Sequence, residues 1–369
     1  MAPLPAGRRA VDGRRDAEMT EPRVAVVGAG AWGTTLAAIV ARSEPVTLVC
    51  RDAALAAAIE STRVNERRLP GITLPEALRA TADGASVRSA ELVIIAVPSR
   101  HVREAVAVVA AHISQSADVL SVVKGLERDT LLRMSEVIAD AGGLPQERVG
   151  ALSGPNLAAE IARGLPASAV VAAQDLALAE RVAARLGRRE FRLYVNQDIL
   201  GVELCGALKN VVAIAAGAAD GLGFGDNGKA GLMTRGLAEM MRVGIAAGAN
   251  PLTFAGLAGI GDVIATCGST LSRNHRLGEE LARGRPWEDL ERELPGTAEG
   301  AYTVGAALAL ARRHDVEMPI AQEVHNALFE GKSVQRCLID LLARESKDEL
   351  ADFAAWVERL EVGDTARPG

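Results

Sequence analysis

Cysteine and histidine are scarce in this chain of 369 residues, which contains four cysteines and five histidines. The cysteines are far apart and form no C-x-x-C pair; they are Cys50, Cys205, Cys267 and Cys337. We therefore expect reduced thiols and a cytoplasmic location. No two histidines have the spacing of metal ligands, so we expect no bound metal.

Long apolar runs and an excess of one charge are also missing. No uninterrupted apolar stretch is long enough to cross a bilayer, so we expect no integral membrane segment. The net charge is −6 and charges of both signs are interspersed, which gives no indication of nucleic-acid binding. Residues 1–20 contain no apolar run of the kind found in a signal peptide, and we expect a disordered tail there.

Lysine is the third scarce residue, because only five of the 41 basic residues are lysines. An arginine cannot be deprotonated in a protein, whereas a partly buried lysine can act as a base. Chance is an adequate explanation for Lys332 and Lys347. The three others, Lys124, Lys209 and Lys229, are candidates for chemistry that an arginine could not perform.

A glycine-rich turn near the start of the chain is the most informative pattern. A short β-branched run ends in the spacing G-x-G-x-x-G at Gly28, Gly30 and Gly33, and an alanine-rich helical pattern follows. Gly28 permits the tight turn, Gly30 leaves room for a pyrophosphate, and Gly33 lets the helix lie close to the strand. A second strand pattern follows at residues 46–50. This order predicts dinucleotide binding; the alternative is an ordinary glycine-rich turn.

The residues after the second strand bear on the choice of cofactor. A site that prefers NAD usually has Asp or Glu there to hold the ribose 2′-hydroxyl. This chain has Arg51 followed by Asp52. Because a guanidinium can pair with a 2′-phosphate, we expect NADPH/NADP to be preferred, with NADH/NAD possible. The alternative is that Arg51 is solvated and Asp52 contacts the ribose.

Strand and helix patterns alternate from about residue 23 to about residue 191. Short buried strands are expected at residues 46–50, 92–97, 119–123, 149–152 and 168–172, with helices such as 102–112 and 131–140 between them. The pattern predicts an α/β fold with a doubly wound parallel (Rossmann-like) sheet. We assign it to an N-terminal dinucleotide-binding domain of residues 21–200, which is followed by a second domain.

Three strand ends in this domain have unusual sequences. Residues 96–99 contain a proline, residues 121–125 end in Lys124 and a glycine, and residues 152–156 form a turn with free main-chain N–H groups. Each alone could be a plain loop. Ligands of such sheets bind beyond the carboxyl ends of the strands, so the three together predict a binding crevice.

The second half of the chain is mostly helical, and we expect a substrate and catalytic domain over residues 201–365. Helical spacing places Lys209 on a small, apolar face with Val202, Gly206 and Ala213. Such a face leaves room for a substrate and disfavours a charged amine. The alternative is a lysine that extends to solvent from a core helix.

Further along, we expect a flexible loop at residues 221–229 and a helix at 232–247. Asp262 follows a group of glycines, and Ser272 can cap a helix that begins at Arg273. That helix N-terminus and the Arg273 guanidinium would together hold a phosphate. The alternative is that Ser272 only caps its helix and Arg273 is solvated.

Taken together, these motifs resemble the bacterial NAD(P)-dependent glycerol-3-phosphate dehydrogenase family, which serves phospholipid synthesis. The similarity runs from about Val24 to Ala343. The segments that carry it are 28–33, 124–126, 153–155, 206–210, 220–225, 234–239, 261–262, 272–274 and 318–319. Three positions depart from the family pattern: Ala31 stands in place of a serine, Asn156 in place of a serine or threonine, and Tyr302 is unusually bulky.

The resemblance implies a reversible hydride transfer between C2 of sn-glycerol 3-phosphate and the nicotinamide, which gives dihydroxyacetone phosphate. It implies that Lys209 is the catalytic acid and base, with Asp262 beside it. The substrate-binding residues that it implies are Lys124, Gly154, Asn156, Lys209, Asp262, Ser272, Arg273 and Asn274. The cofactor-binding residues are Gly28, Gly30, Ala31, Trp32, Gly33, Arg51, Lys124, Ala158, Arg273, Thr297 and Glu299. Analogy of fold suggests a homodimer.

Two other classes of protein are alternatives. Other hydroxy-acid dehydrogenases have the same two-domain plan, with a catalytic lysine on the first helix of the second domain. The Ser272–Asn274 motif argues against those that act on substrates without phosphate. A non-catalytic dinucleotide sensor would not need Lys209, Asp262 and Arg273 together.

Overall fold

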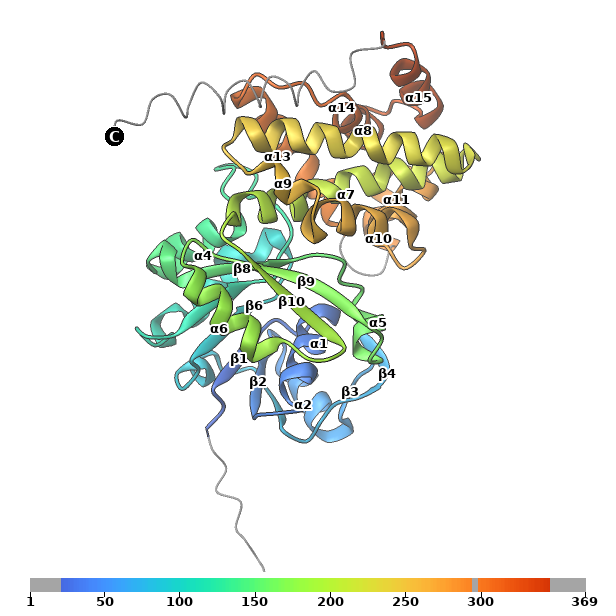
Figure 1. Ribbon diagram of the computed structural model, residues 1–369. Helices are drawn as coiled ribbons and strands as arrows, with labels where there is room; N and C mark the ends of the chain where they lie inside the picture. Colours follow the sequence, from blue (N-terminus) through green and yellow to red (C-terminus); the bar gives the residue numbers. More distant parts are fainter. Residues whose placement is uncertain (1–20, 294–297, 346–369) are drawn as a thin grey trace, which may run out of the picture.

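Figure 1 shows the computed structural model of the protein, which describes residues 21–293 and 298–345. A sheet flanked by helices forms the first half of the chain, and a group of helices stacked on one end of this sheet forms the second half. The tail expected at residues 1–20 lies outside the described residues.

The sheet has eight strands, in the spatial order β10-β9-β8-β7-β6-β1-β2-β5. In chain order they are β1 (Val24–Val27), β2 (Val46–Val49), β5 (Leu78–Thr81), β6 (Leu92–Ile95), β7 (Asp118–Ser121), β8 (Val149–Ser153), β9 (Ala167–Ala172) and β10 (Phe191–Asn196). The doubly wound, mostly parallel sheet is confirmed. One difference is that β9 pairs antiparallel with β8, and β10 follows the direction of β9.

The reversal at β9 has a local reason. Parallel neighbours need a crossover connection, usually a full helix, on one face of the sheet. Between β8 and β9 the chain forms only the five-residue helix α5 (Ala158–Ala162). The chain therefore turns back beside β8 instead of crossing over the sheet.

Helices cover both faces of the sheet. They include α1 (Ala31–Val40), α2 (Ala53–Thr62), α3 (Val102–Val109), α4 (Met134–Gly142) and α6 (Leu176–Leu186). Val26 packs with Leu36 of α1 and Val182 of α6 on one face. The next residue, Val27, packs with Val106 of α3 on the other face. Burial on both faces explains the continuous apolar strands that the sequence contains.

A small hairpin, β3 (Val64–Asn65) and β4 (Leu69–Thr73), was not expected from the sequence, and neither were β5 and β10. Asn65 is fully buried and fixes the hairpin to the glycine-rich turn. Its Nδ2 donates to the carbonyl oxygen of Ala29 at 3.1 Å and to Oγ1 of Thr34 at 2.8 Å. The hairpin thus forms one wall beside the predicted dinucleotide site.

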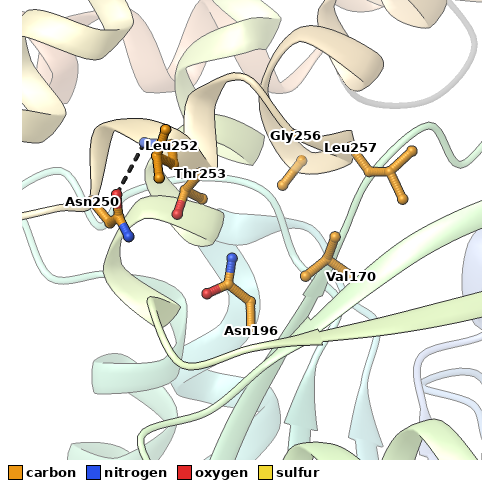
Figure 2. Close-up of a pocket in the computed structure, with 8 residues that line it drawn as sticks. Val170, Asn196, Asn250, Leu252, Thr253, Gly256 and Leu257 are labelled. Atoms are coloured by element: carbon orange, nitrogen blue, oxygen red, sulfur yellow. Dashed lines mark hydrogen bonds between the residues drawn. The ribbon is translucent and has the colours of Figure 1, made fainter.

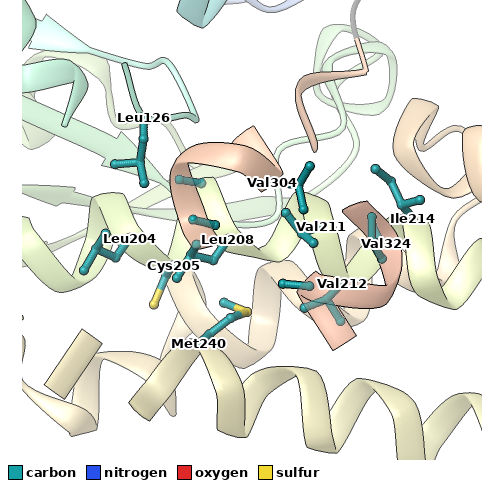
Figure 3. Packing of buried hydrophobic residues seen from close by; sticks show 14 of the residues in the cluster. Leu126, Leu204, Cys205, Leu208, Val211, Val212, Ile214, Met240, Val304 and Val324 are labelled. Carbon is teal, nitrogen blue, oxygen red and sulfur yellow. The ribbon is translucent and has the colours of Figure 1, made fainter. Parts of the chain in front are cut away.

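The helical half is built around α7 (Ile199–Gly221), which is buried along most of its length. The elements that follow are α8 (Gly225–Ala246), α9 (Pro251–Phe254), the π-turn η5 (Leu257–Gly261), α10 (Asp262–Gly268), α11 (Arg273–Ala282), α12 (Trp287–Glu293), α13 (Glu299–Arg313), α14 (Pro319–Phe329) and α15 (Val334–Leu342). Figure 3 shows how Leu208 and Val212 of α7 pack among the surrounding helices, close to Met240 of α8 and Val304 of α13.

The start of α8 corrects one prediction. The flexible loop expected at residues 221–229 is short, because α8 begins at Gly225. Only Gly223 and Gly225 in this stretch have positive φ angles, which produce the turn. Lys229 then lies one turn inside the helix, and its Nζ donates to Asp220 at 2.9 Å.

Close packing of α11 on α7 depends on a glycine. A Cβ on Gly217 would lie 1.9 Å from the carbonyl oxygen of His275, so no larger residue fits there without moving α11. Further along the contact, the Asp220 carboxylate lies 2.8 Å from Nε2 of His275. These contacts dock the first turn of α11 on the C-terminal part of α7, and the Asn274 side chain reaches Asn210, the neighbour of Lys209.

Among the described residues, two helical stretches are long and apolar enough to cross a membrane by length and composition, Ile199–Gly221 and Pro251–Gly268. The first is α7, and 89% of its most apolar window is buried inside the protein, which is typical of a core helix. The second combines α9, η5 and α10, and half of it is buried.

A buried ion pair joins the two halves of the chain. Glu203 of α7 accepts hydrogen bonds from Nη1 of Arg133 at 2.7 Å and from the main-chain N–H of Ser135 at 2.8 Å. Both Ser135 and Glu203 are buried at the N-terminal end of α4. Burial raises the pKa of Glu203, although the Arg133 charge acts against the rise. The pair fixes α7 against the sheet half six residues before Lys209.

Candidate active site

The predicted crevice lies where three neighbouring strands end. β6, β7 and β8 are adjacent and parallel, so the segments that follow them meet at one edge of the sheet. Lys124 follows β7 and Gly154 follows β8. The Lys124 Nζ donates to the carbonyl oxygen of Gly154 at 2.8 Å, which joins two of the three strand ends.

Asp262 lies at the centre of the site and pairs with two lysines. Lys209, from the middle of α7, donates to Oδ1 of Asp262 at 2.9 Å. Lys124, from the sheet, donates to the other carboxylate oxygen. Thr266, one turn further along α10, donates to Oδ1 at 3.1 Å and accepts from Lys209. Three of the predicted site residues are therefore in direct contact, together with Thr266.

The charges of this group favour an anionic ligand. Burial lowers the pKa of Lys124 to about 8, although the Asp262 carboxylate partly opposes this and Lys209 adds to it. Burial acts to raise the pKa of Asp262, but Lys124 and Lys209 outweigh it and hold this pKa below its ordinary value. An ionised Asp262 cannot neutralise two lysines. The group therefore carries positive charge in a buried setting, where charge interactions are strong.

The predicted phosphate site is the N-terminus of α11. The Ser272 hydroxyl accepts from the main-chain N–H of His275 at 3.2 Å, which confirms that Ser272 caps this helix. Arg273 is the first residue of the helix, and its side chain is exposed. The charges that act on it are those of Glu299 and Arg68. A helix N-terminus with a nearby guanidinium is suited to holding a phosphate.

Asn274 and Asn156 are placed differently from each other. The Asn274 side chain is buried, donates to Oδ1 of Asn210 at 2.9 Å and accepts from the Gly300 N–H at 3.0 Å. It therefore connects α7 with α13. The polar side-chain atoms of Asn156 are buried and have no hydrogen-bond partner among the described residues. Since unsatisfied buried amides are costly, Asn156 is available to a ligand.

The glycine-rich turn fits a dinucleotide. Gly28 has a φ of +117°, and a Cβ on Gly33 would lie 2.0 Å from the carbonyl oxygen of Gly28, so the turn requires both glycines. A Cβ on Gly30 would meet only the carbonyl oxygen of Ala96, at 3.9 Å, which leaves open space for a phosphate group. The helix that follows starts at Ala31, and in the part of the chain that the structure describes it has no side-chain cap and Nε1 of Trp32 is buried without a partner.

The other predicted cofactor residues lie around this turn. Arg51 is exposed directly after β2. Asp52 caps α2 by accepting from the Ala54 N–H at 2.8 Å, so one of its oxygens is already engaged. The carbonyl oxygen of Ala158 accepts from Thr35 of α1 at 3.2 Å, which places α5 against α1. Thr297 lies outside the described residues.

Glu299 is partly buried at the start of α13 and lies next to the turn that follows β6. Its carboxylate accepts hydrogen bonds from the hydroxyl and the main-chain N–H of Ser99. Thr266 was not singled out in the sequence analysis, and Ser99 appeared there only as part of the strand end at residues 96–99. Thr266 could have been found from its position four residues after Asp262, which places both side chains on one helix face.

A cavity elsewhere does not belong to this site. It has a volume of about 140 Å³ and lies between the last two strands and the α9–η5 segment. Figure 2 shows Val170 and Asn196 on one side and Leu252, Thr253 and Leu257 on the other. None of its lining residues is a predicted site residue. Within residues 21–293 and 298–345, no group of three or more His, Cys, Asp or Glu side chains could hold a metal ion.

Comparison with known proteins agrees with this geometry. Two family models match the chain: the N-terminus of NAD-dependent glycerol-3-phosphate dehydrogenase over residues 23–179, and its C-terminus over residues 198–339. A glycerol-3-phosphate dehydrogenase [NAD(P)+] from Streptomyces griseus is 47% identical over 334 residues, which cover 90% of this chain and 99% of the relative. One from Desulfitobacterium hafniense is 42% identical and covers 90% and 94%.

A solved structure extends the similarity to the fold. The crystal structure of glycerol-3-phosphate dehydrogenase from Coxiella burnetii superposes with a TM-score of 0.83 and is 36% identical. The match covers 88% of this chain and 100% of that one. The chain therefore belongs to the NAD-dependent glycerol-3-phosphate dehydrogenase family.

Proposed function

We propose that this protein interconverts dihydroxyacetone phosphate and sn-glycerol 3-phosphate with NAD(P) as hydride carrier. The observation that carries the proposal is the contact of Lys124 and Lys209 with one carboxylate, Asp262, beside the N-terminus of α11. This arrangement supports a proton donor, a positively charged cleft and a phosphate site that act on one substrate. The family assignment supports the same reaction.

When bound, the nicotinamide would supply the hydride that reduces C2 of the substrate. Negative charge then develops on the C2 oxygen, and Lys209 donates a proton to it; in the reverse direction Lys209 accepts this proton. Asp262 orients Lys209 through the 2.9 Å contact. Lys124 adds positive charge that favours the developing oxyanion. Arg273 and the N-terminus of α11 hold the substrate phosphate.

We propose that the cofactor lies along the glycine-rich turn and that NADPH is preferred to NADH. Gly28, Gly30 and Gly33 would hold the pyrophosphate at the N-terminus of α1, since the space above Gly30 is open. Arg51 would pair with the 2′-phosphate. The use of Asp52 as a helix cap supports this choice over the alternative in which Asp52 holds the ribose.

The direct experiment mixes the purified protein with NADPH and dihydroxyacetone phosphate and follows the loss of NADPH absorbance. We expect turnover, and the product should be sn-glycerol 3-phosphate. Dihydroxyacetone without the phosphate is the control, and its reduction should be slower by orders of magnitude. Equal rates with and without the phosphate would contradict the proposal and favour another hydroxy-acid dehydrogenase.

We propose that the protein acts in the cytoplasm as a homodimer and supplies glycerol 3-phosphate for phospholipid synthesis. The four cysteines are buried and unpaired, which supports a reducing compartment. Sedimentation of the purified protein would test the dimer.

We also propose that the boundary between the two domains lies at residues 200 and 201. The eight strands of the main sheet end at Asn196, and α7 begins at Ile199. Limited proteolysis of the purified protein would test this boundary.

A further inference from the structure

A short 3-10 turn, η2 (Ser99–His101), connects the sheet half of the protein with α13. It follows β6, and two of its residues contact α13. Ser99 donates to the Glu299 carboxylate through its hydroxyl and its main-chain N–H. The guanidinium carbon of Arg100 lies 4.5 Å from the centre of the Tyr302 ring, a favourable cation–π distance.

The first turn of α13 also contacts α11, on the side of the proposed substrate site. The N–H of Gly300, next to Glu299, donates to Asn274 at 3.0 Å. Asn274 is the second residue of α11, directly after Arg273, and its amide donates to Asn210, the neighbour of Lys209. Glu299 and Gly300 therefore stand between the end of β6 and the helix end that holds phosphate.

Ser99 has little freedom to move. Its side chain is buried, and a Cβ on Gly125 would lie only 2.6 Å from the Ser99 Cβ. Gly125 is the neighbour of Lys124, so Ser99 is confined between the lysine-bearing strand end and Glu299. A partly buried carboxylate is stabilised by hydrogen-bond donors, and in the described part of the chain Ser99 supplies two of them to Glu299.

We propose that Ser99 is a positioning residue for the substrate phosphate, although it lies in the other half of the protein. It fixes Glu299, and the first turn of α13 then fixes Asn274 and the N-terminus of α11. In this proposal its hydroxyl acts through Glu299 and not by direct contact with a ligand. The inference rests on the proposed function only in assigning the substrate phosphate to α11.

The primary test is Ser99→Ala, which removes the hydroxyl donor without adding volume. A small displacement of a binding group is enough to change kinetics strongly, so KM for dihydroxyacetone phosphate should rise roughly 10-fold. KM should change more than kcat, because Lys209 and Asp262 are untouched. Thr303→Val is the matched control: Thr303 is buried on the same helix, and its hydroxyl has no hydrogen-bond partner within residues 21–293 and 298–345. This control should leave KM within about 2-fold of wild type.

A double-mutant cycle shows whether Ser99 acts through Glu299. If it does, adding Ser99→Ala to Glu299→Ala should change KM by less than about 2-fold, because the link is already broken. A further rise of the size seen in the single variant would overturn the proposal and make Ser99 a ligand contact. So would a Ser99→Ala variant with wild-type KM.

Direct binding keeps the test independent of turnover. Calorimetric titration with inorganic phosphate should show roughly 10-fold weaker binding to Ser99→Ala than to wild type. Equal binding by the two proteins would overturn the inference. If the wild-type protein bound phosphate but did not reduce dihydroxyacetone phosphate, the proposed function would be contradicted. The phosphate titration would still test the role of Ser99.

Discussion

Lys209 contacts Asp262 at 2.9 Å, although 53 residues separate them in the chain. The contact forms because α10, which begins at Asp262, packs against the middle of α7. Lys124 reaches the same carboxylate from the sheet. The reacting group of the protein is thus assembled only when both halves are folded and in contact.

Replacing Lys209 should abolish most of the activity. Lys209→Ala removes the proton donor, and we expect kcat to fall by at least about 10²-fold while cofactor affinity stays near wild type. Lys209→Arg should fail almost as badly, because a guanidinium keeps the charge but cannot release a proton. Steady-state kinetics and cofactor titration measure both effects.

Lys332→Ala is a suitable control for this experiment, because Lys332 pairs with Glu323 and Asp340 away from the site. It should leave kcat near wild type. If Lys209→Arg retained most of the wild-type kcat, Lys209 would be an electrostatic anchor, and the base would have to be sought at Lys124.

Arg273→Lys should be poorly tolerated although the charge is kept. A lysine cannot reproduce the two parallel hydrogen bonds that an arginine makes to a phosphate. KM for dihydroxyacetone phosphate should therefore rise clearly, with a smaller change in kcat. Arg276→Lys, an exposed change on the same helix, is the control. A wild-type KM for Arg273→Lys would place Arg273 outside the phosphate site.

Arg51 should decide between the two cofactors. Arg51→Ala should weaken NADPH binding by roughly 10-fold or more, because a charge-assisted hydrogen bond to the 2′-phosphate is worth about 1.5–3 kcal/mol. NADH lacks this phosphate, so its affinity should change little. Fluorescence titration with each cofactor measures the difference, with Arg42→Ala as a surface control. Equal losses for both cofactors would remove Arg51 from the site.

Stability should depend on pH through Glu239. This buried residue of α8 accepts from the main-chain N–H groups of Ile320 and Ala321 at the start of α14. Burial raises its pKa from 4.5 to about 7, against the effect of these hydrogen bonds. The folded state therefore binds this proton more tightly than the unfolded state. Below pH 4.5 this difference adds of the order of 3 kcal/mol to the free energy of unfolding. The contribution is lost as the pH rises through about 7.

Urea unfolding at a series of pH values measures this effect. Glu239→Gln cannot ionise, so its free energy of unfolding should change less between pH 5 and pH 8 than that of wild type. The exposed Glu147→Gln should retain the wild-type slope. Parallel pH curves for wild type and Glu239→Gln would show that Glu239 does not titrate in this range.

Local features of this protein were predictable from sequence because neighbours in the chain determine them. The turn at Gly28, the cap at Ser272 and the strand end at Lys124 are of this kind, and the structure contains all three. The apolar face around Lys209 also correctly predicted a buried lysine.

Features that depend on distant parts of the chain were not predictable. The direction of β9 follows from the short α5 connection, and the bond between Asn274 and Gly300 follows from the docking of α13. The start of α8 at Gly225 was missed for another reason. The glycines of residues 221–229 suggest a loop, but Gly221 ends α7 and Gly228 lies inside α8, and only Gly223 and Gly225 have the positive φ angles of a turn.

The burial of α7 has a consequence for synthesis of the protein. The helices α8, α10, α11, α13 and α14, which surround this apolar helix, follow it in the chain. At a translation rate of roughly 5–20 residues per second, the ribosome needs on the order of ten seconds to reach the end of α14. During this interval the nascent chain exposes a segment that resembles a membrane span. This is the stage at which a chaperone would bind it most readily.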